Sequence, residues 1–230
     1  MKRYRIFILF AMAMALCTGL SSCSENDGVV EEYPDWQNTN QNYFSNAIAQ
    51  ARQQVAQGST EWKVLRSMSL NADVATSDNH FVVVQVLKEG TGSGCPLYTD
   101  SVKVNFRARL LPSVSYPQGY VFAQSYATEE LDPESAVPAT LSVAQSTSTT
   151  NGLSTVLQQM HIGDRWKATV PYTLGYGEVQ MSSPVVAPFS TLIYDVQLVA
   201  YYRYPSPLSA PAKNAANSND SQAKGYWVYE

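Results

Sequence analysis

The sequence SVKVNFRARL occupies residues 101–110 and is the stretch that decides the fold class. Apolar residues take every second position of this stretch: Val102, Val104, Phe106, Ala108 and Leu110. Polar and charged residues fill the positions between them: Lys103, Asn105, Arg107 and Arg109. A repeat of two residues is the period of a β-strand, whose side chains point alternately to opposite faces. One face of this strand is therefore expected to be buried and the other wet, as in an antiparallel sheet.

Further strand-like segments lie on both sides of this stretch. Residues 81–87 are rich in β-branched side chains, and residues 191–201 alternate again between apolar and polar positions. Shorter strands are predicted at 120–124, 139–143 and 165–170. One helix is predicted at 152–160, because apolar residues recur there at helical spacing, after a cap at Thr150 or Asn151: Leu153, Val156, Leu157 and Met160. This order predicts an α+β domain over residues 80–203, a mainly antiparallel sheet curled around one short helix.

An accessory helical segment is predicted at 40–79, ahead of this domain. Its apolar residues fall on one face of a helix that Gly58 ends: Phe44, Ile48, Ala51 and Val55. This helix either packs on the domain or serves as an arm for a homodimer. The residues Trp62, Leu65 and Met68 either extend a further helical turn or pack the helix onto the domain.

The first residues carry a targeting signal. Lys2, Arg3 and Arg5 precede an apolar run at 6–16, which is too short for a transmembrane anchor and typical of a secretory signal. The following Leu20-Ser21-Ser22-Cys23 resembles the lipobox of bacterial lipoproteins. That resemblance implies a signal peptide over 1–22, lipid on Cys23, a tether over 23–39 and attachment to a membrane in the cell envelope. The acidic residues after Cys23 resemble the export tethers of Bacteroidetes-type lipoproteins. The alternative is an ordinary cleaved signal that happens to end beside a cysteine.

Other features exclude several classes of function. The net charge is −4 at pH 7, which argues against a nucleic-acid partner. His80 and His161 lie far apart in the sequence without acidic or cysteine partners at ligand spacing, so no metal site is assigned. The glycines at 90–94 indicate a plain turn, because no helix with a phosphate-binding Lys follows them. Residues 204–230 are predicted to form a disordered tail, whose aromatic end at 226–229 either adds a strand or packs on the domain.

Several short motifs follow one another in a recognisable order. They read VKVNF at 102–106, GYVF at 119–122, GLSTVLQQMHIGD at 152–164, TLGYG at 173–177, PVVAP at 184–188 and TLIYDVQL at 191–198. In this order they resemble the FKBP family of peptidyl-prolyl cis-trans isomerases, over roughly residues 80–203.

The resemblance implies an isomerase that binds proline-containing peptides or unfolded proteins in an apolar pocket and assists the folding of envelope or secreted proteins, with no cofactor and no metal. By position, Tyr176 matches the tyrosine that donates its hydroxyl to the substrate carbonyl. Further positions match the walls and floor of the proline pocket: Phe106, Phe122, Leu153, Val185, Val186 and Tyr194.

Two departures from the family pattern leave a second function open. Ala123 stands where the family usually has Asp, and Phe106 stands where it usually has Tyr. The two losses are consistent with each other, because the tyrosine hydroxyl usually bonds that Asp. The alternative to an enzyme is therefore a catalytically weak or inactive binding or chaperone module on the same scaffold. A surface lipoprotein that recognises glycan or peptide is a third reading.

Overall fold

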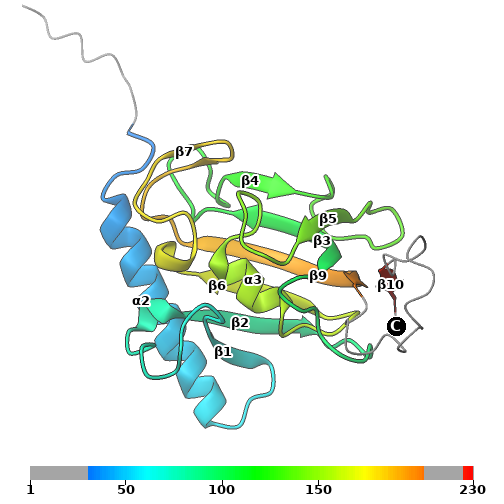
Figure 1. Cartoon of the computed structure of the whole chain (residues 1–230). Helices are drawn as coiled ribbons and strands as arrows, with labels where there is room; N and C mark the ends of the chain where they lie inside the picture. The colour runs from blue at the N-terminus through cyan, green and yellow to red at the C-terminus, as the bar shows by residue number, and fades with distance from the viewer. Residues whose placement is uncertain (1–30, 205–224, 230) are drawn as a thin grey trace, which may run out of the picture. The chain divides into compact units, whose positions relative to one another are not determined.

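A computed structural model describes residues 31–204 and 225–229 of the chain, and within them one antiparallel sheet dominates (Figure 1). Six strands are hydrogen-bonded in the order β1-β2-β6-β9-β3-β4. Strand β5 also pairs with β3, and β10 pairs with β9. The strands are β1 (Trp62–Arg66), β2 (Phe81–Lys88), β3 (Ser101–Arg109), β4 (Val121–Gln124), β5 (Ala139–Ser142), β6 (Arg165–Val170), β9 (Leu192–Arg203) and β10 (Tyr226–Val228). The short strands β7 (Met181–Ser182) and β8 (Val185–Val186) form a separate hairpin.

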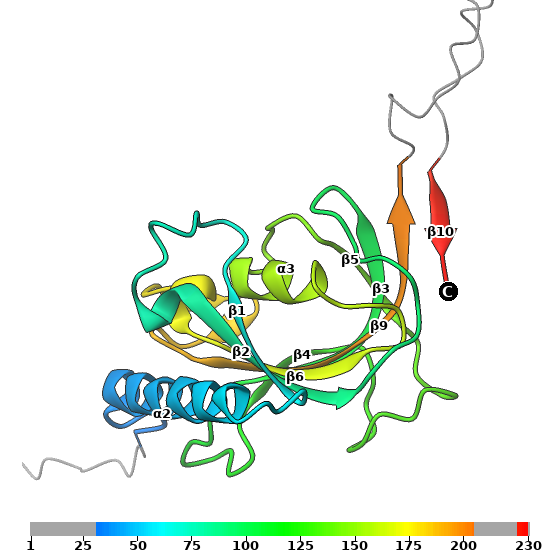
Figure 2. The same cartoon turned by 90° about the horizontal axis from the view of Figure 1, so that it is seen from below.

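The sheet curls around helix α3 (Asn151–Leu157), which lies on its inner face (Figure 2). The main core forms between them: Val102, Val104 and Ala108 of β3 and Val156 and Leu157 of α3 are fully buried. Thr150 caps the helix, because its hydroxyl accepts a hydrogen bond from the backbone N–H of Leu153 at 3.3 Å. The predicted α+β fold, an antiparallel sheet curled around one short helix, is confirmed. Two 3₁₀ turns, η1 (Asp78–His80) and η2 (Tyr172–Leu174), complete the domain.

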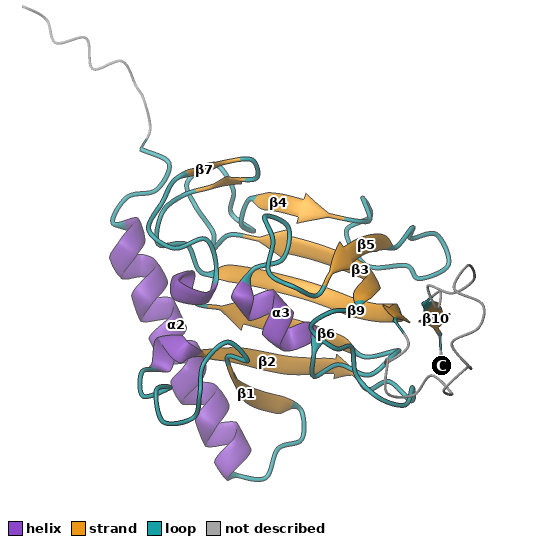
Figure 3. Ribbon diagram, viewed as in Figure 1, coloured by secondary structure: helices purple, strands orange, loops and turns teal. Residues whose placement is uncertain are grey.

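Helix α2 (Trp36–Ala56), at the left of Figure 3, packs on the outer face of the sheet, opposite to α3 (Figure 2). Its residues Phe44, Ile48 and Ala51 form a second buried cluster with Val83 of β2. The neighbours of Val83 along β2 face the opposite way, into the core around α3. The apolar stripe of α2 is therefore covered by the chain's own sheet, except at Val55, which is 45% exposed.

Two boundaries differ from the sequence predictions. Helix α2 begins at Trp36 rather than Asn40, so the last part of the predicted tether is helical. Residues 62–66 form strand β1, which pairs with β2, and the further helical turn considered for this stretch is wrong. The reason is a period of two: Trp62 and Val64 pack toward α2, while Leu65 packs toward the main core.

The aromatic end of the chain adds a strand to the sheet. Strand β10 pairs with the end of β9, with Trp227 opposite Tyr202. The ammonium of Lys103 lies 4.7 Å from the ring centre of Trp227 and 5.3 Å from that of Tyr229. This end of the predicted disordered tail is therefore ordered, and the rest of the tail, residues 205–224, lies outside the described residues.

The predicted signal peptide, the lipid site at Cys23 and the tether up to residue 30 also lie outside the described residues. Among the residues that the structure does describe, no helix combines the length and the apolar character needed to cross a bilayer.

Candidate active site

A cavity of about 460 Å³ opens on the inner side of the sheet, beside the edge strands. Strands β3, β4, β5 and β9 supply its apolar lining, the loop before α3 adds Thr147 and Ser148, and the β7–β8 hairpin adds Ser183 and Pro184. The apolar and aromatic lining residues are Phe106, Phe122, Ala123, Ala139, Leu141, Tyr176 and Tyr194. A concave, mostly apolar site with a few polar groups at its edge is typical of a small-ligand pocket. We refer to it below as the inner pocket.

Three aromatic rings shape this pocket. The ring of Phe122 meets the ring of Tyr176 edge to face, with 6.1 Å between centroids and an angle of 81°. It meets the ring of Tyr194 in the same way, at 6.1 Å and 83°. Such T-shaped pairs are a favourable geometry for aromatic rings, so they hold one another in place. The result is a recess lined by three rings that contact one another edge to face.

The hydroxyl of Tyr176 is the hydrogen-bond donor at the edge of the pocket. It donates to the backbone carbonyl of Thr147 at 3.2 Å. Burial raises the pKa of Tyr176 above its ordinary value of 10.0, so the hydroxyl keeps its proton at neutral pH. A ligand carbonyl that replaced the carbonyl of Thr147 would accept the hydrogen bond that the Tyr176 hydroxyl now donates to Thr147.

Tyr194 contributes a different kind of hydroxyl. The residue is 2% exposed, and its hydroxyl forms no hydrogen bond of normal geometry within residues 31–204 and 225–229, although the side chain of Thr150 interacts with it weakly. Burial raises the pKa of Tyr194, so this side chain is neutral. Its ring serves the pocket, while its buried hydroxyl is a cost to stability.

The structure brings together only part of the predicted site. Phe106, Phe122, Tyr176 and Tyr194 line the same pocket. Leu153, Val185 and Val186 do not line it. Leu153 is buried in the core within α3, Val186 is buried in the β7–β8 hairpin, and Val185 of the same hairpin is 51% exposed.

Sequence reasoning missed the polar rim and one apolar wall. Ala139 and Leu141 of β5 point into the pocket, and their spacing of two residues was a usable signal. The other lining residues lie in loops or turns, where the sequence has no periodicity that predicts which side chains face a cavity. They are Thr147, Ser148, Ser183 and Pro184.

Ala123 of β4 pairs with Ala108, two residues along β3 from Phe106, and Ala123 and Phe106 both line the inner pocket. This edge of the pocket therefore carries a methyl group and a phenyl ring where a carboxylate and a hydroxyl would form a polar pair. Replacing both partners of such a pair by apolar groups leaves no unpaired polar atom behind, so the cost to stability is small.

Arg107 anchors the loop that joins the pocket strands β4 and β5. The residue is 6% exposed, and its guanidinium donates to three backbone carbonyls of this loop. The acceptors are the carbonyl of Glu129 at 2.7 Å, that of Tyr126 at 3.4 Å and that of Thr128. The guanidinium also lies 4.7 Å from the ring centre of Tyr126. Arg107 thus positions the loop from the outer face of the sheet.

Comparison with known proteins finds similarity to one family over part of the chain. Residues 95–199 match the model of the family "FKBP-type peptidyl-prolyl cis-trans isomerase". The chain is 30% identical over 119 residues to the macrophage infectivity potentiator of Trypanosoma cruzi, covering 52% of each chain. It is 31% identical over 115 residues to the FKBP-type 22 kDa peptidyl-prolyl cis-trans isomerase of Escherichia coli, covering 50% of this chain and 47% of that protein. The chain thus spans about half the length of the curated relatives it matches. These matches support the assignment of residues 95–199 to the FKBP-type family.

Solved structures of the same kind are also similar to the chain. A peptidyl-prolyl cis-trans isomerase from Pseudomonas syringae is 22% identical, with a TM-score of 0.43, and the match covers 68% of this chain and 94% of that one. FkpA from Escherichia coli is 23% identical, with a TM-score of 0.41, and the match covers 71% of this chain and 62% of that one.

Proposed function

We propose that this chain is a peptidyl-prolyl cis-trans isomerase, on the premise that residues 95–199 form an FKBP-type domain. The observation that carries the proposal is the inner pocket, where three aromatic rings surround a recess and the hydroxyl of Tyr176 stands at its edge. A proline ring is apolar and of a size that such a recess holds. The substrates are proline-containing peptide segments of unfolded or partly folded proteins.

The chemistry follows from the imide bond before proline. Rotation about a peptide bond has a barrier of about 18–20 kcal/mol, because resonance keeps the bond planar. At the top of this barrier the imide is twisted and its resonance is lost, and no covalent bond has been broken. A catalyst therefore needs neither a nucleophile nor a metal, but only an environment that binds the twisted imide more tightly than the planar one.

The described residues fit this requirement. Phe122, Tyr194 and Phe106 enclose the proline ring and keep water from it, which favours the less polar twisted imide. Tyr176 exchanges the carbonyl of Thr147 for a substrate carbonyl and holds that end of the peptide while the imide turns. The chain thereby fixes one side of the bond and leaves the other side free to rotate.

A second function has specific observations in its favour. Ala123 and Phe106 leave the edge of the pocket without a polar pair, and the hydroxyl of Tyr176 already has an acceptor within the chain. A pocket built in this way could bind proline segments without accelerating their isomerisation. The alternative function is a binding or chaperone module on the FKBP frame.

One experiment separates the two functions. The rate of cis-to-trans exchange of a short X-Pro peptide is measured with the full chain in a mild detergent, for the wild type, Tyr176→Phe and Phe122→Ala. An isomerase accelerates exchange, and loss of one neutral hydrogen bond in Tyr176→Phe lowers kcat/KM by about three- to tenfold. Tyr172→Phe serves as the matched control, because it removes a hydroxyl from the neighbouring turn η2, where the ring packs on Phe189 outside the inner pocket.

The outcomes are distinct. No acceleration by a folded wild-type chain that still binds the peptide leaves the binding module and rejects the enzyme. In that case Ala123→Asp combined with Phe106→Tyr is expected to restore acceleration if the missing polar pair is the cause. Equal rates for the wild type and Tyr176→Phe would reject the donor role of Tyr176.

We further propose that the mature chain is a lipoprotein of the cell envelope, anchored through lipid on Cys23 after removal of residues 1–22, and that it assists the folding of envelope or secreted proteins. The signal-like first residues and the lipobox-like Leu20-Ser21-Ser22-Cys23 support this proposal. Metabolic labelling with an alkynyl fatty acid tests it: the wild type is expected to carry the label and to sediment with membranes, whereas Cys23→Ala carries no label.

A homodimer through α2 is a separate proposal. Because the stripe of Phe44, Ile48 and Ala51 packs on the chain's own sheet, such a dimer would use the exposed face of the helix, which includes Tyr43 and Val55. Sedimentation of the full chain in detergent, with and without Val55→Glu, measures whether dimers form and whether this face makes them.

A further inference from the structure

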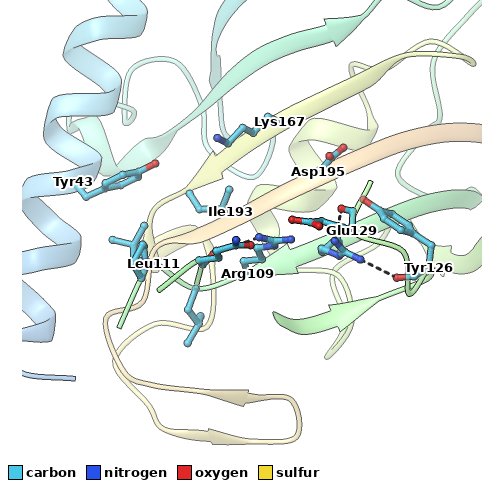
Figure 4. Close-up of a pocket in the computed structure, with 12 residues that line it drawn as sticks. Tyr43, Arg109, Leu111, Tyr126, Glu129, Lys167, Ile193 and Asp195 are labelled. Carbon is cyan, nitrogen blue, oxygen red and sulfur yellow. Dashed lines mark hydrogen bonds between the residues drawn. The ribbon is translucent and has the colours of Figure 1, made fainter. Parts of the chain in front are cut away.

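A second cavity of about 460 Å³ lies on the outer face of the sheet, opposite to the inner pocket (Figure 4). Alternation along β3 separates the two: Phe106 faces the inner pocket, while Arg107 and Arg109 line the outer cavity. Tyr43 of α2 bounds the outer cavity at one end, and Tyr126 and Glu129 of the loop after β4 bound it at the other. The outer cavity shares no lining residue with the inner pocket.

The negative charge at the centre of this cavity is already neutralised. Asp195 of β9 lies opposite Arg107 of β3 and Lys167 of β6 in the sheet register. It nevertheless pairs with a different cation, because both of its oxygens accept hydrogen bonds from Arg165, at 2.8 and 2.6 Å. A bidentate pair of this kind is the strongest arrangement that a carboxylate and a guanidinium form. Arg107 and Lys167 are thus left without the carboxylate that lies beside them.

In the described parts of the chain, the other cations of the cavity lining are not paired with a carboxylate. Within the described residues, Lys167 forms no hydrogen bond or ion pair, and Arg109 has a single long bond, 3.5 Å to the carbonyl of Gln118. The buried guanidinium of Arg107 has carbonyl and amide acceptors but no ion pair among residues 31–204 and 225–229. The opposing group in the lining is Glu129, and Glu130 lies near Arg165. The lining therefore keeps an excess of positive charge, although the whole chain carries −4.

Apolar side chains form the rest of the wall. Leu111 and Pro112 follow β3, Ile193 stands on β9, and the ring of Tyr43 projects from α2. Tyr43 is 39% exposed, so part of its ring is open to a partner. The outer cavity therefore has charged residues on its floor and apolar residues along one side. A purely polar anion such as phosphate would contact the charged residues but not the apolar ones.

We propose that the outer cavity binds a peptide segment in which an acidic side chain adjoins an aliphatic or aromatic one. The carboxylate is held by Lys167 and Arg109, and the apolar neighbour packs against Tyr43, Leu111 and Ile193. The site is independent of the inner pocket, so it gives the chain a second contact with a protein client on the opposite face of the same sheet.

Calorimetric titration of the full chain in detergent tests this site. The probe is acetyl-Leu-Glu-Leu-amide, and its Gln counterpart is the uncharged control. Because a hydrogen bond to a charged group is worth more than one between neutral groups, the Glu peptide is expected to bind about tenfold more tightly than the Gln peptide. The difference is expected to shrink as the ionic strength rises from about 0.05 M to about 0.5 M, since salt screens exposed charges.

Variants locate the binding. Lys167→Met and Arg109→Met are each expected to weaken binding of the Glu peptide about fivefold to tenfold, by loss of one charge-assisted bond. Lys88→Met is the matched control, because Lys88 is an exposed lysine at the end of β2 that lines neither cavity. Thermal unfolding of each variant confirms that it is folded.

Several results would overturn the proposal. They are equal affinity for the Glu and Gln peptides, unchanged affinity in both Lys167→Met and Arg109→Met, or an equal loss in Lys88→Met. Loss of binding in Phe122→Ala would assign the peptide to the inner pocket instead. Tighter binding of N-acetyl-leucine than of the Glu peptide would assign the outer cavity to small carboxylic acids rather than to peptides. None of these measurements depends on isomerase activity. The peptide site and the isomerase function can therefore be rejected independently of each other.

Discussion

Among single residues, Gly119 shows why the turn before β4 tolerates one residue type only. Its φ is +84°, and a Cβ placed there would lie 2.1 Å from the carbonyl oxygen of Leu110. The first feature disfavours any side chain, and the second excludes one unless the backbone moves. The glycine that opens the GYVF motif therefore fixes the approach of Phe122 to the inner pocket.

Replacing this glycine separates the two effects. Gly119→Ala is expected to lower the free energy of unfolding by about 3 kcal/mol, because it adds a backbone clash to an unfavourable φ. Gly58→Ala has the same φ of +84° but nothing within 4 Å of the added Cβ, so about 1 kcal/mol is expected. Urea unfolding measures both variants. Equal losses would show that the clash at Gly119 relaxes without cost.

Arg107 acts on the inner pocket through the loop that it holds. Lysine keeps the charge but offers a single ammonium in place of a fork that reaches several carbonyls. Arg107→Lys is therefore expected to raise KM for an X-Pro peptide by about threefold or more, with a smaller change in kcat, because the loop between β4 and β5 loosens. Arg52→Lys, on the exposed side of α2 in an ion pair with Asp78, is the control. A fall in kcat alone would argue against a positioning role.

At the scale of elements, a buried asparagine fastens helix α2 to the domain. The side-chain oxygen of Asn40 accepts a hydrogen bond from the backbone N–H of Thr191 at 2.7 Å, and its amide donates to the carbonyl of Trp36 at 2.7 Å. Trp36 in turn donates from its indole to the hydroxyl of Ser190 at 2.9 Å. These contacts tie the start of the helix to the segment that enters β9.

Removing this contact tests how firmly the helix is attached. Asn40→Ala leaves the buried N–H of Thr191 unpaired, and about 1–3 kcal/mol of unfolding free energy is expected to be lost. Asn38→Ala, an exposed asparagine on the same turn, is expected to change it by less than about 0.5 kcal/mol. A small effect at Asn40 would mean that α2 is held mainly by its buried apolar residues and by Trp36.

The sequence predicted the elements whose periodicity is regular and misjudged those that depend on a distant partner. The alternation in β3 and the helical spacing in α3 are local, and both elements occur where they were predicted. However, α3 ends at Leu157 rather than at residue 160, and the second face of β3, which was expected to be wet, is buried at Asn105 and Arg107. The residues of β1 were given a helical alternative, because their role becomes visible only when Val64 lies opposite Val83 of β2. Val185 and Val186 were predicted as pocket walls, but their hairpin turns one into the core and the other to solvent. Which face a two-residue strand presents is decided by tertiary contacts.

For the whole molecule, buried and partly buried tyrosines contribute to stability at alkaline pH. Burial raises the pKa of Tyr176, Tyr194, Tyr126, Tyr43 and Tyr33 above the ordinary value of 10.0. A raised pKa means that the folded state holds the proton more tightly than the unfolded state. The stabilisation is therefore fully present below pH 10 and is lost as the pH rises through the higher pKa of the folded state.

The free energy of unfolding is thus expected to fall gradually above about pH 8, because burial also raises the pKa of Cys95 above 9.0, and more steeply above about pH 10 as the tyrosines titrate. Tyr194→Phe is expected to be neutral or slightly stabilising at neutral pH, since it removes a buried hydroxyl that forms no hydrogen bond of normal geometry in the described residues, and to reduce the alkaline fall. Urea unfolding across this range measures both effects. An unchanged alkaline fall in Tyr194→Phe would show that other groups cause it.

Strand β3 separates the inner pocket from the outer cavity. The number of residues in this strand is therefore more tightly constrained than the identity of its side chains. A substitution at Arg109 alters the outer cavity, and a substitution at Phe106 alters the inner pocket. Deletion of a single residue within β3 would exchange the two faces and place arginines against the core. Descendants of this gene are therefore expected to vary the two cavities independently by point substitution, while insertions and deletions between residues 102 and 109 are eliminated by selection.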